Sequence, residues 1–128
     1  MTVRLLLFCC AVALLAVPAA AESRLRTVSL RLVEVYNAGD GALAAGLLAP
    51  GLRNGRSEAE LTAWLAGLHS RYGRLERVSL PLYGNGAPDT AIFAAYFETC
   101  ARDLFLSLDA EGRIEQLFIR GPEPETEQ

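Results

Sequence analysis

Apolar residues recur every three or four positions between residues 23 and 72, which predicts helices over the first half of the domain. The first stripe runs through Leu25, Val28, Leu32 and Tyr36. Gly39 follows, and glycine there supplies the left-handed backbone that commonly ends a helix. The pattern therefore predicts one amphipathic helix that stops just before a sharp corner.

A second, shorter helix is expected to start directly after this corner. Asp40 is a natural N-cap, because its carboxylate accepts hydrogen bonds from the free amides of the next turn. Leu43, Leu47 and Leu48 give the segment one apolar face. The pair Pro50-Gly51 is expected to end it.

The third predicted helix has the clearest signals. Ser57 and Glu60 have the spacing of a capping box, in which two side chains bond to each other's backbone amides. Gly73 marks the end. The apolar positions between them follow at spacings of three and four: Leu61, Trp64, Leu65, Leu68 and Tyr72.

Beyond Gly73 the period changes from 3.6 to 2, which is typical of strands. Pro81 confines the first strand to an edge or a bulge, because proline cannot donate to a ladder. The second strand is rich in aromatic and apolar residues, so we expect it to be buried on both faces. Turn-forming loops at 84–89 and 110–112 separate the strands. The four predicted strands cover residues 75–83, 90–99, 103–109 and 113–120.

Helices followed by strands with short connections indicate an α+β layer architecture. We expect three N-terminal helices packed on the concave face of a curved, mainly antiparallel four-stranded sheet. Such a sheet encloses a cavity against the helices, and that is where we expect the function to lie.

The first 21 residues have the layout of a secretory signal peptide. Arg4 is followed by an apolar run from Leu5 to Val17 and by small residues up to Ala21. An uncleaved membrane anchor is the alternative, but the run is short for a bilayer span. We expect cleavage before Glu22, a secreted or periplasmic product, one domain over 22–120 and a disordered acidic tail over 121–128.

Charge and cysteine content narrow the function classes. Without the leader, 11 arginines face 15 carboxylates, and three of these carboxylates lie in the tail. The domain is thus nearly neutral, with no long-range field that favours nucleic acid or an anionic membrane. Cys100 is the only cysteine left after cleavage, so no intramolecular disulfide forms, and we expect its thiol to be buried.

The residues expected to line the cavity are mainly aromatic, as in apolar ligand sites, although aromatic residues also fill cores. His69 is the single histidine and borders the apolar face of the third helix, where it is either a polar anchor or a half-exposed helix residue. No catalytic residue, metal ligand set or cofactor motif is predicted, because one histidine and scattered carboxylates offer no suitable spacing. The predicted ligand-binding residues are Tyr36, Trp64, Leu68, His69, Tyr96 and Phe97.

The order of elements, the YNAGD corner and the LDAEGRIEQLFI ending resemble the nuclear transport factor 2-like superfamily of cone-shaped domains. The chain is most similar to a bacterial domain of unknown function found in secreted and hydrolase-associated proteins. The matching residues are Ala63, the segment 69–73, Leu108-Asp109, Gly112 and Ile114. The resemblance covers residues 23–120.

The superfamily includes ketosteroid isomerase and scytalone dehydratase, so the resemblance raises the question of an enzyme. The tyrosine of the isomerase pattern would fall on Leu32, and its general base near Gly55-Arg56. The dehydratase pattern needs a histidine–aspartate pair, and His69 is the only histidine. This chain therefore lacks the residues that either enzyme pattern requires at the matching positions.

These observations lead to a hypothesis and two alternatives. The leading hypothesis is an exported, non-catalytic module that binds a small apolar ligand or a protein partner through the cavity. The alternatives are an isomerase- or dehydratase-like enzyme that uses His69 with Tyr36 or Tyr96, and an accessory subunit of a secreted hydrolase. The resemblance also implies a homodimer formed through the sheet.

Overall fold

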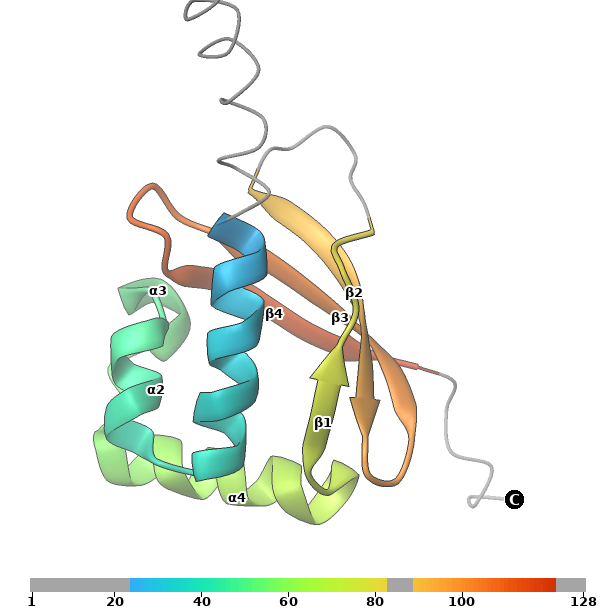
Figure 1. Ribbon diagram of the computed structural model, residues 1–128. Coiled ribbons are helices and arrows are strands. Elements are labelled where there is room, and N and C mark those ends of the chain that lie inside the picture. Colours follow the sequence, from blue (N-terminus) through green and yellow to red (C-terminus); the bar gives the residue numbers. More distant parts are fainter. Residues whose placement is uncertain (1–23, 83–88, 122–128) are drawn as a thin grey trace, which may run out of the picture.

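The computed structural model describes residues 24–82 and 89–121 (Figure 1). These residues form an α+β fold in which helices precede a four-stranded antiparallel sheet, as the sequence predicts. The predicted leader with its cleavage site before Glu22, the loop positions 84–88 and the tail beyond Gly121 lie outside the described residues.

The helical half contains one helix more than expected. An N-terminal helix covers residues 24–38, and it is followed by α2 (Gly41–Leu47), α3 (Pro50–Arg53) and α4 (Glu58–Tyr72). The prediction that Pro50 ends the second helix was wrong, because Pro50 begins α3 instead. The first residue of a helix needs no backbone N–H, so proline is well suited to that position.

The corner between the N-terminal helix and α2 is built as predicted. Gly39 has a φ of 64°, and its N–H donates to the carbonyl groups of Val35 and Tyr36. The Asp40 carboxylate then accepts a hydrogen bond of 2.9 Å from the backbone N–H of Ala42. A helix C-cap is thus joined directly to a helix N-cap.

Both predicted ends of α4 are also present. The Ser57 hydroxyl accepts from the Glu60 N–H at 3.1 Å, and the Glu60 carboxylate accepts from the Ser57 N–H at 2.8 Å. Gly73 caps the other end with a φ of 78°. These caps fix the length of α4, and with it the position of its apolar stripe.

The sheet has the order β1-β2-β3-β4, with every neighbouring pair antiparallel. β1 is shorter than predicted and ends at Val78, although Ser79 and Leu82 still donate backbone hydrogen bonds to carbonyl groups of β2. Pro81 lies in this extension of an edge strand, as predicted. The strands are β1 (Leu75–Val78), β2 (Thr90–Phe97), β3 (Ala101–Leu108) and β4 (Ile114–Arg120).

β2 is buried on one face only, so the prediction of two buried faces was wrong. Ala91, Phe93, Ala95 and Phe97 are buried, whereas Ile92, on the other face, is 44% exposed. Helices cover a single side of the sheet: in Figure 1 the N-terminal helix stands in front of the strands and α4 crosses below it. The opposite side, called the outer face below, has no covering layer among the described residues.

α2 packs against α4 through its smallest residues, and this changes the face that it buries. Leu43 is exposed, contrary to the prediction, whereas Gly41, Ala44 and Leu47 are buried. The backbone N–H of Gly41 donates to the Thr62 hydroxyl at 2.8 Å. The two helices are close enough at this point that only hydrogen fits on the Cα atom of residue 41.

We predict that Gly41→Ala lowers the free energy of unfolding by about 1 to 3 kcal/mol, because overpacking forces the two helices apart. A Cβ atom there would overlap the Glu58 carbonyl oxygen and the Thr62 hydroxyl. Urea unfolding followed by circular dichroism measures the change. The control is Gly46→Ala in the same helix, where a Cβ meets nothing within 4 Å; it should gain about 0.5 to 1 kcal/mol. Equal effects at both positions would contradict the argument.

Candidate functional site

An apolar cavity lies between the helices and the covered face of the sheet. Its volume is about 20 Å³, which is room for about one water molecule. Sites for small-molecule ligands are typically about 300 to 1,000 Å³. All of the residues that line it are aromatic or aliphatic: Leu32, Tyr36, Trp64, Leu65, Leu68, Leu75, Phe97, Leu104, Leu117 and Ile119.

The periodicity of the chain places these side chains. Leu32 and Tyr36 lie one helical turn apart on the N-terminal helix, and Trp64 and Leu68 do the same on α4. The strands contribute alternate residues, such as Leu117 and Ile119 of β4. Two amphipathic helices and one face of a sheet therefore converge on a single small space.

The structure brings five of the six predicted site residues together. Tyr36, Trp64, Leu68 and Phe97 line the cavity, and His69 stacks on the Tyr36 ring. Leu117 and Ile119 were not singled out from the sequence. The alternation along the last strand could have indicated them, but alternation alone does not say which face is covered.

Tyr96 lies away from the cavity, so its predicted position was wrong. Its neighbours Ala95 and Phe97 are buried, and successive side chains of a strand point to opposite faces. On the outer face the Arg77 guanidinium lies 3.9 Å from the centre of the Tyr96 ring. Tyr96 is therefore part of the outer face, together with its cross-strand partner Arg77.

Tyr36 and His69 form a stacked pair at the end of the cavity. The ring centres are 4.4 Å apart, with planes inclined by 17°. The His69 Nε2 atom lies 2.6 Å from the Tyr36 carbonyl oxygen, which only accepts hydrogen bonds, so Nε2 carries the proton. The Tyr36 hydroxyl donates to the Gly73 carbonyl at 2.7 Å. Both polar groups are thus bonded to backbone at the end of a helix.

Burial raises the pKa of Tyr36 to about 12, with smaller contributions from Tyr72 and Cys100. The phenol is consequently protonated, and its proton is held by the Gly73 carbonyl. A tyrosine in this state serves as a fixed donor to the backbone and not as a base.

Asn37 connects the same corner to the sheet. Its side-chain amide donates to the Leu75 carbonyl at 2.8 Å, and its side-chain oxygen accepts from the Leu75 N–H at 3.0 Å. The side chain pairs with the first residue of β1 as a neighbouring strand would. The end of the N-terminal helix is therefore locked to the start of the sheet.

Trp64 lines the cavity from α4 and is held in place from outside. The Arg56 guanidinium lies 5.1 Å from the centre of the indole ring. The same guanidinium donates to the carbonyl groups of Leu52 and Arg53 at the end of α3. The indole is thus covered by a side chain that is itself fixed.

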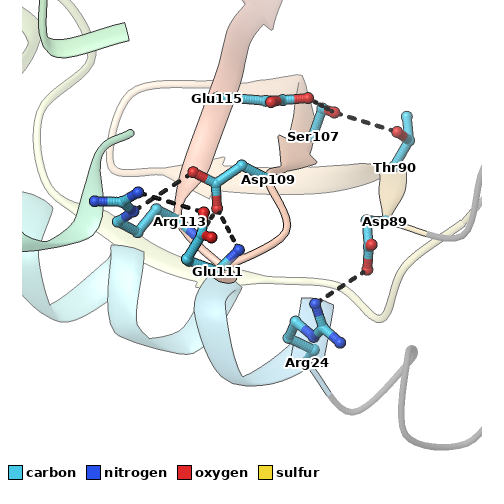
Figure 2. Close-up of polar contacts among 8 residues, drawn as sticks. All are labelled: Arg24, Asp89, Thr90, Ser107, Asp109, Glu111, Arg113 and Glu115. Atoms are coloured by element: carbon cyan, nitrogen blue, oxygen red, sulfur yellow. Dashed lines mark hydrogen bonds and ion pairs between the residues drawn. The ribbon is translucent and has the colours of Figure 1, made fainter. Parts of the chain in front are cut away.

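A second group of polar side chains lies at the other end of the sheet (Figure 2). The Asp109 Oδ1 atom accepts from the backbone N–H groups of Glu111 and Arg113 at 2.9 Å each, and Arg113 Nε lies 3.4 Å from Asp109 Oδ2. Nearby, Arg24 approaches Asp89 at 3.9 Å. The contacts of Asp109 shape the β3–β4 hairpin, where this residue acts as a turn former, and the Arg24–Asp89 pair ties the residue before β2 to the N-terminal helix.

Residues 24–82 and 89–121 contain no candidate metal site. No group of three histidine, cysteine or carboxylate side chains there is placed to hold a metal ion. Cys100 is free and only half-buried, packed against the core at the β2–β3 turn. Its thiol is therefore less enclosed than predicted.

Comparison with known proteins adds no family to this description. No protein-family model, curated protein sequence or solved structure matches the chain. Of the helices in the described ranges, none is sufficiently long and apolar to cross a membrane.

We predict that Asn37→Ala lowers the free energy of unfolding by about 2 to 4 kcal/mol, because the buried N–H and carbonyl of Leu75 both lose their partner. Asn37→Asp should be similarly damaging, since a carboxylate accepts from the N–H but cannot donate to the carbonyl. Chemical denaturation of the purified variants measures both. Glu34→Ala, an exposed position one turn earlier, should change stability by less than about 0.5 kcal/mol. If Asn37→Asp is as stable as wild type, the donor to Leu75 contributes nothing.

The hairpin predicts a pH dependence. The backbone N–H groups of Arg113 and then Glu111 hold the pKa of Asp109 below its ordinary value of 3.8. A depressed pKa stabilises the fold above 3.8, and this contribution disappears as the pH falls through the folded-state value. Asp109→Asn should therefore be less stable than wild type at neutral pH, and the two proteins should converge in acid. Denaturant midpoints measured across this range test it, and a constant difference at every pH would count against the assignment.

Proposed function

We propose that this chain is an exported, non-catalytic module that binds a protein partner through the outer face of a curved sheet whose concave side is filled by the helices. The observation that carries the proposal is an uncovered apolar row on that face. Ile92 of β2 lies opposite Phe105 of β3, and Phe105 lies opposite Phe118 of β4. Ile92 is 44% exposed and Phe118 is 47% exposed.

The row is continuous across three strands. The rings of Phe105 and Phe118 are 5.8 Å apart, within the range of aromatic pairs. Tyr96 under Arg77 extends the same face toward β1. Aromatic residues and arginine are the residue types enriched at protein interfaces, and an exposed apolar cluster of this kind favours a docking role.

The small volume of the cavity favours a packed core over a binding site for a small ligand. At about 20 Å³ it has no room for a molecule of cofactor or drug size. Arg56 fixes Trp64, so the indole is already packed. Of the two binding modes expected from the sequence, the protein partner is the one that the packing supports.

The fixed state of Tyr36 and His69 favours a role without catalysis. An isomerase or dehydratase needs a group that gains and loses a proton next to the substrate. The Tyr36 hydroxyl and the His69 Nε2 proton are bonded to backbone carbonyl groups, and no charged residue lines the cavity. The polar atoms near the cavity therefore serve the fold.

Site-specific photo-crosslinking in the cells that export the protein tests the proposal. A benzophenone side chain at position 118 should yield an adduct of protein mass, whereas the same group at position 30 should not. Leu30 is the matched control, because it is also 47% exposed but lies on the N-terminal helix. Mass spectrometry of the adduct then tells a second copy from another exported protein, such as a hydrolase.

Two results would contradict a protein-binding role. One is an equal yield of adducts at positions 118 and 30, which would indicate only random collision. The other is a small molecule retained by the purified protein in native mass spectrometry, with no adduct at position 118.

A further inference from the structure

The two edges of the sheet are built differently. β1 is four residues long, carries the charged residues Glu76 and Arg77, has a register shift between Leu75 and Arg77, and leads to Pro81. Short length, charge, bulges and proline are the devices that keep an edge strand from pairing with another chain. The β1 edge is thus protected.

The β4 edge carries charges near its two ends, Glu115 and Arg120, but it lacks the short length and the proline of the β1 edge. It is seven residues long, contains no proline, and has its register shift only at its start, opposite Ser107 and Leu108. Leu48 forms a parallel bridge with Ile114, and the Ala49 N–H donates to the Ile114 carbonyl at 2.8 Å. Past Ile114, no backbone group from residues 24–82 or 89–121 bonds to this edge from outside.

The centre of β4, residues 117–119, is apolar on both faces, between Glu115 and Gln116 at one end and Arg120 at the other. Leu117 and Ile119 point to the cavity and are only half-buried, whereas Phe118 points to the outer face and is 47% exposed. A neighbouring strand would cover all three at once. An unpaired edge with an exposed apolar centre is a template for pairing with another strand.

We propose that a second copy of this chain pairs its β4 antiparallel to this β4, with the twofold axis at Phe118, so that two sheets become one of eight strands. The proposal deepens the proposed function, on which it rests, by naming the partner and the end of the apolar row that it contacts. Two rows of Ile92, Phe105 and Phe118 then join into one across the interface.

The side chains select this register. Opposite residues of antiparallel strands share a face, so inward residues must meet inward residues. Pairing Phe118 with itself puts Leu117 opposite Ile119 of the second copy, and Gln116 opposite its Arg120. Centring on Leu117 would instead place Phe118 opposite Gln116. The first register pairs apolar with apolar on both faces.

Charge complementarity supports a second copy as the occupant. Glu115 bonds to Ser107 and so lies on the outer face near one end of β4, while Arg120 lies at the other end. Antiparallel pairing brings the Glu115–Gln116 end of each copy to Arg120 of the other. In this register Glu115 lies opposite Gly121 of the other copy, one residue from Arg120, so the two long side chains are within reach of each other.

Cysteine crosslinking of the full chain, purified after export and carrying Cys100→Ser, tests the pairing. Phe118→Cys should form a disulfide-linked dimer under mild oxidation, because opposite positions meet the geometric requirement for a disulfide. The control is Ile92→Cys, which is similarly exposed but lies two strands from the edge. We expect linking at 118 to be at least about tenfold faster, since pairing raises the effective thiol concentration.

A mixture of Gln116→Cys and Arg120→Cys chains tests the register. The mixture should form a disulfide-linked heterodimer, whereas each chain alone should stay largely monomeric, because its two thiols would lie four residues out of step. Linking that is no faster in the mixture than in the separate chains would overturn the register and the proposal.

Amide hydrogen exchange tests the pairing on the chain without substitutions, so the result does not depend on how a variant folds. As the protein concentration rises, amides of β4 should exchange more slowly while those of the β1 edge do not. Exchange in β4 that is independent of concentration would overturn the pairing. Faster disulfide formation at 92 than at 118, or a photo-adduct at 118 with a different protein, would also overturn it while leaving the proposed function in place.

Discussion

The arrangement of helices on the sheet depends on one polar joint. Residues 36–37 make four hydrogen bonds to other elements: the Tyr36 hydroxyl to Gly73, the Tyr36 carbonyl to His69, and the Asn37 side chain to both the carbonyl and the N–H of Leu75. The end of the N-terminal helix, the end of α4 and the start of β1 meet there. Because these groups are largely buried, each would be costly to leave unpaired. The joint therefore fixes the end of α4 and the start of β1 relative to the N-terminal helix.

This joint also engages the polar side chains that lie next to the cavity. The side chains with acid–base chemistry nearest the cavity are Tyr36 and His69, and both are engaged in it. The space that remains is small and apolar. The Tyr36 hydroxyl and the His69 Nε2 atom are bonded to backbone within the corner. On the other side of the sheet, Ile92, Phe105 and Phe118 form an apolar row that continues across β2, β3 and β4.

Local signals predicted most of the fold, and the errors about which face of an element is buried have one physical cause. The Gly39–Asp40 corner, the Ser57–Glu60 capping box and the β-hairpin at Gly112 are encoded in a few adjacent residues, and all were predicted. Whether a strand is covered on one face or both depends on elements distant in sequence. β2 has apolar residues on both sides, so periodicity could not show that Ile92 and Tyr96 face outward. The same limit applies to the site, because the Asn37–Leu75 and Tyr36–Gly73 bonds join residues nearly 40 positions apart.

The cavity and the open β4 edge share residues, so the packing of the interior and the proposed pairing of two chains are connected. Leu117 and Ile119 line the cavity and also form the inward side of the β4 edge. A strand added to β4 would extend the covered face of the sheet past these residues and continue the apolar layer opposite Trp64 and Leu68. Apolar surface removed from water contributes about 25 cal/mol per Å², so half-buried residues at an edge add to association while they add little to the isolated fold. Their incomplete burial is thus understandable if the unit that completes the core is larger than one chain.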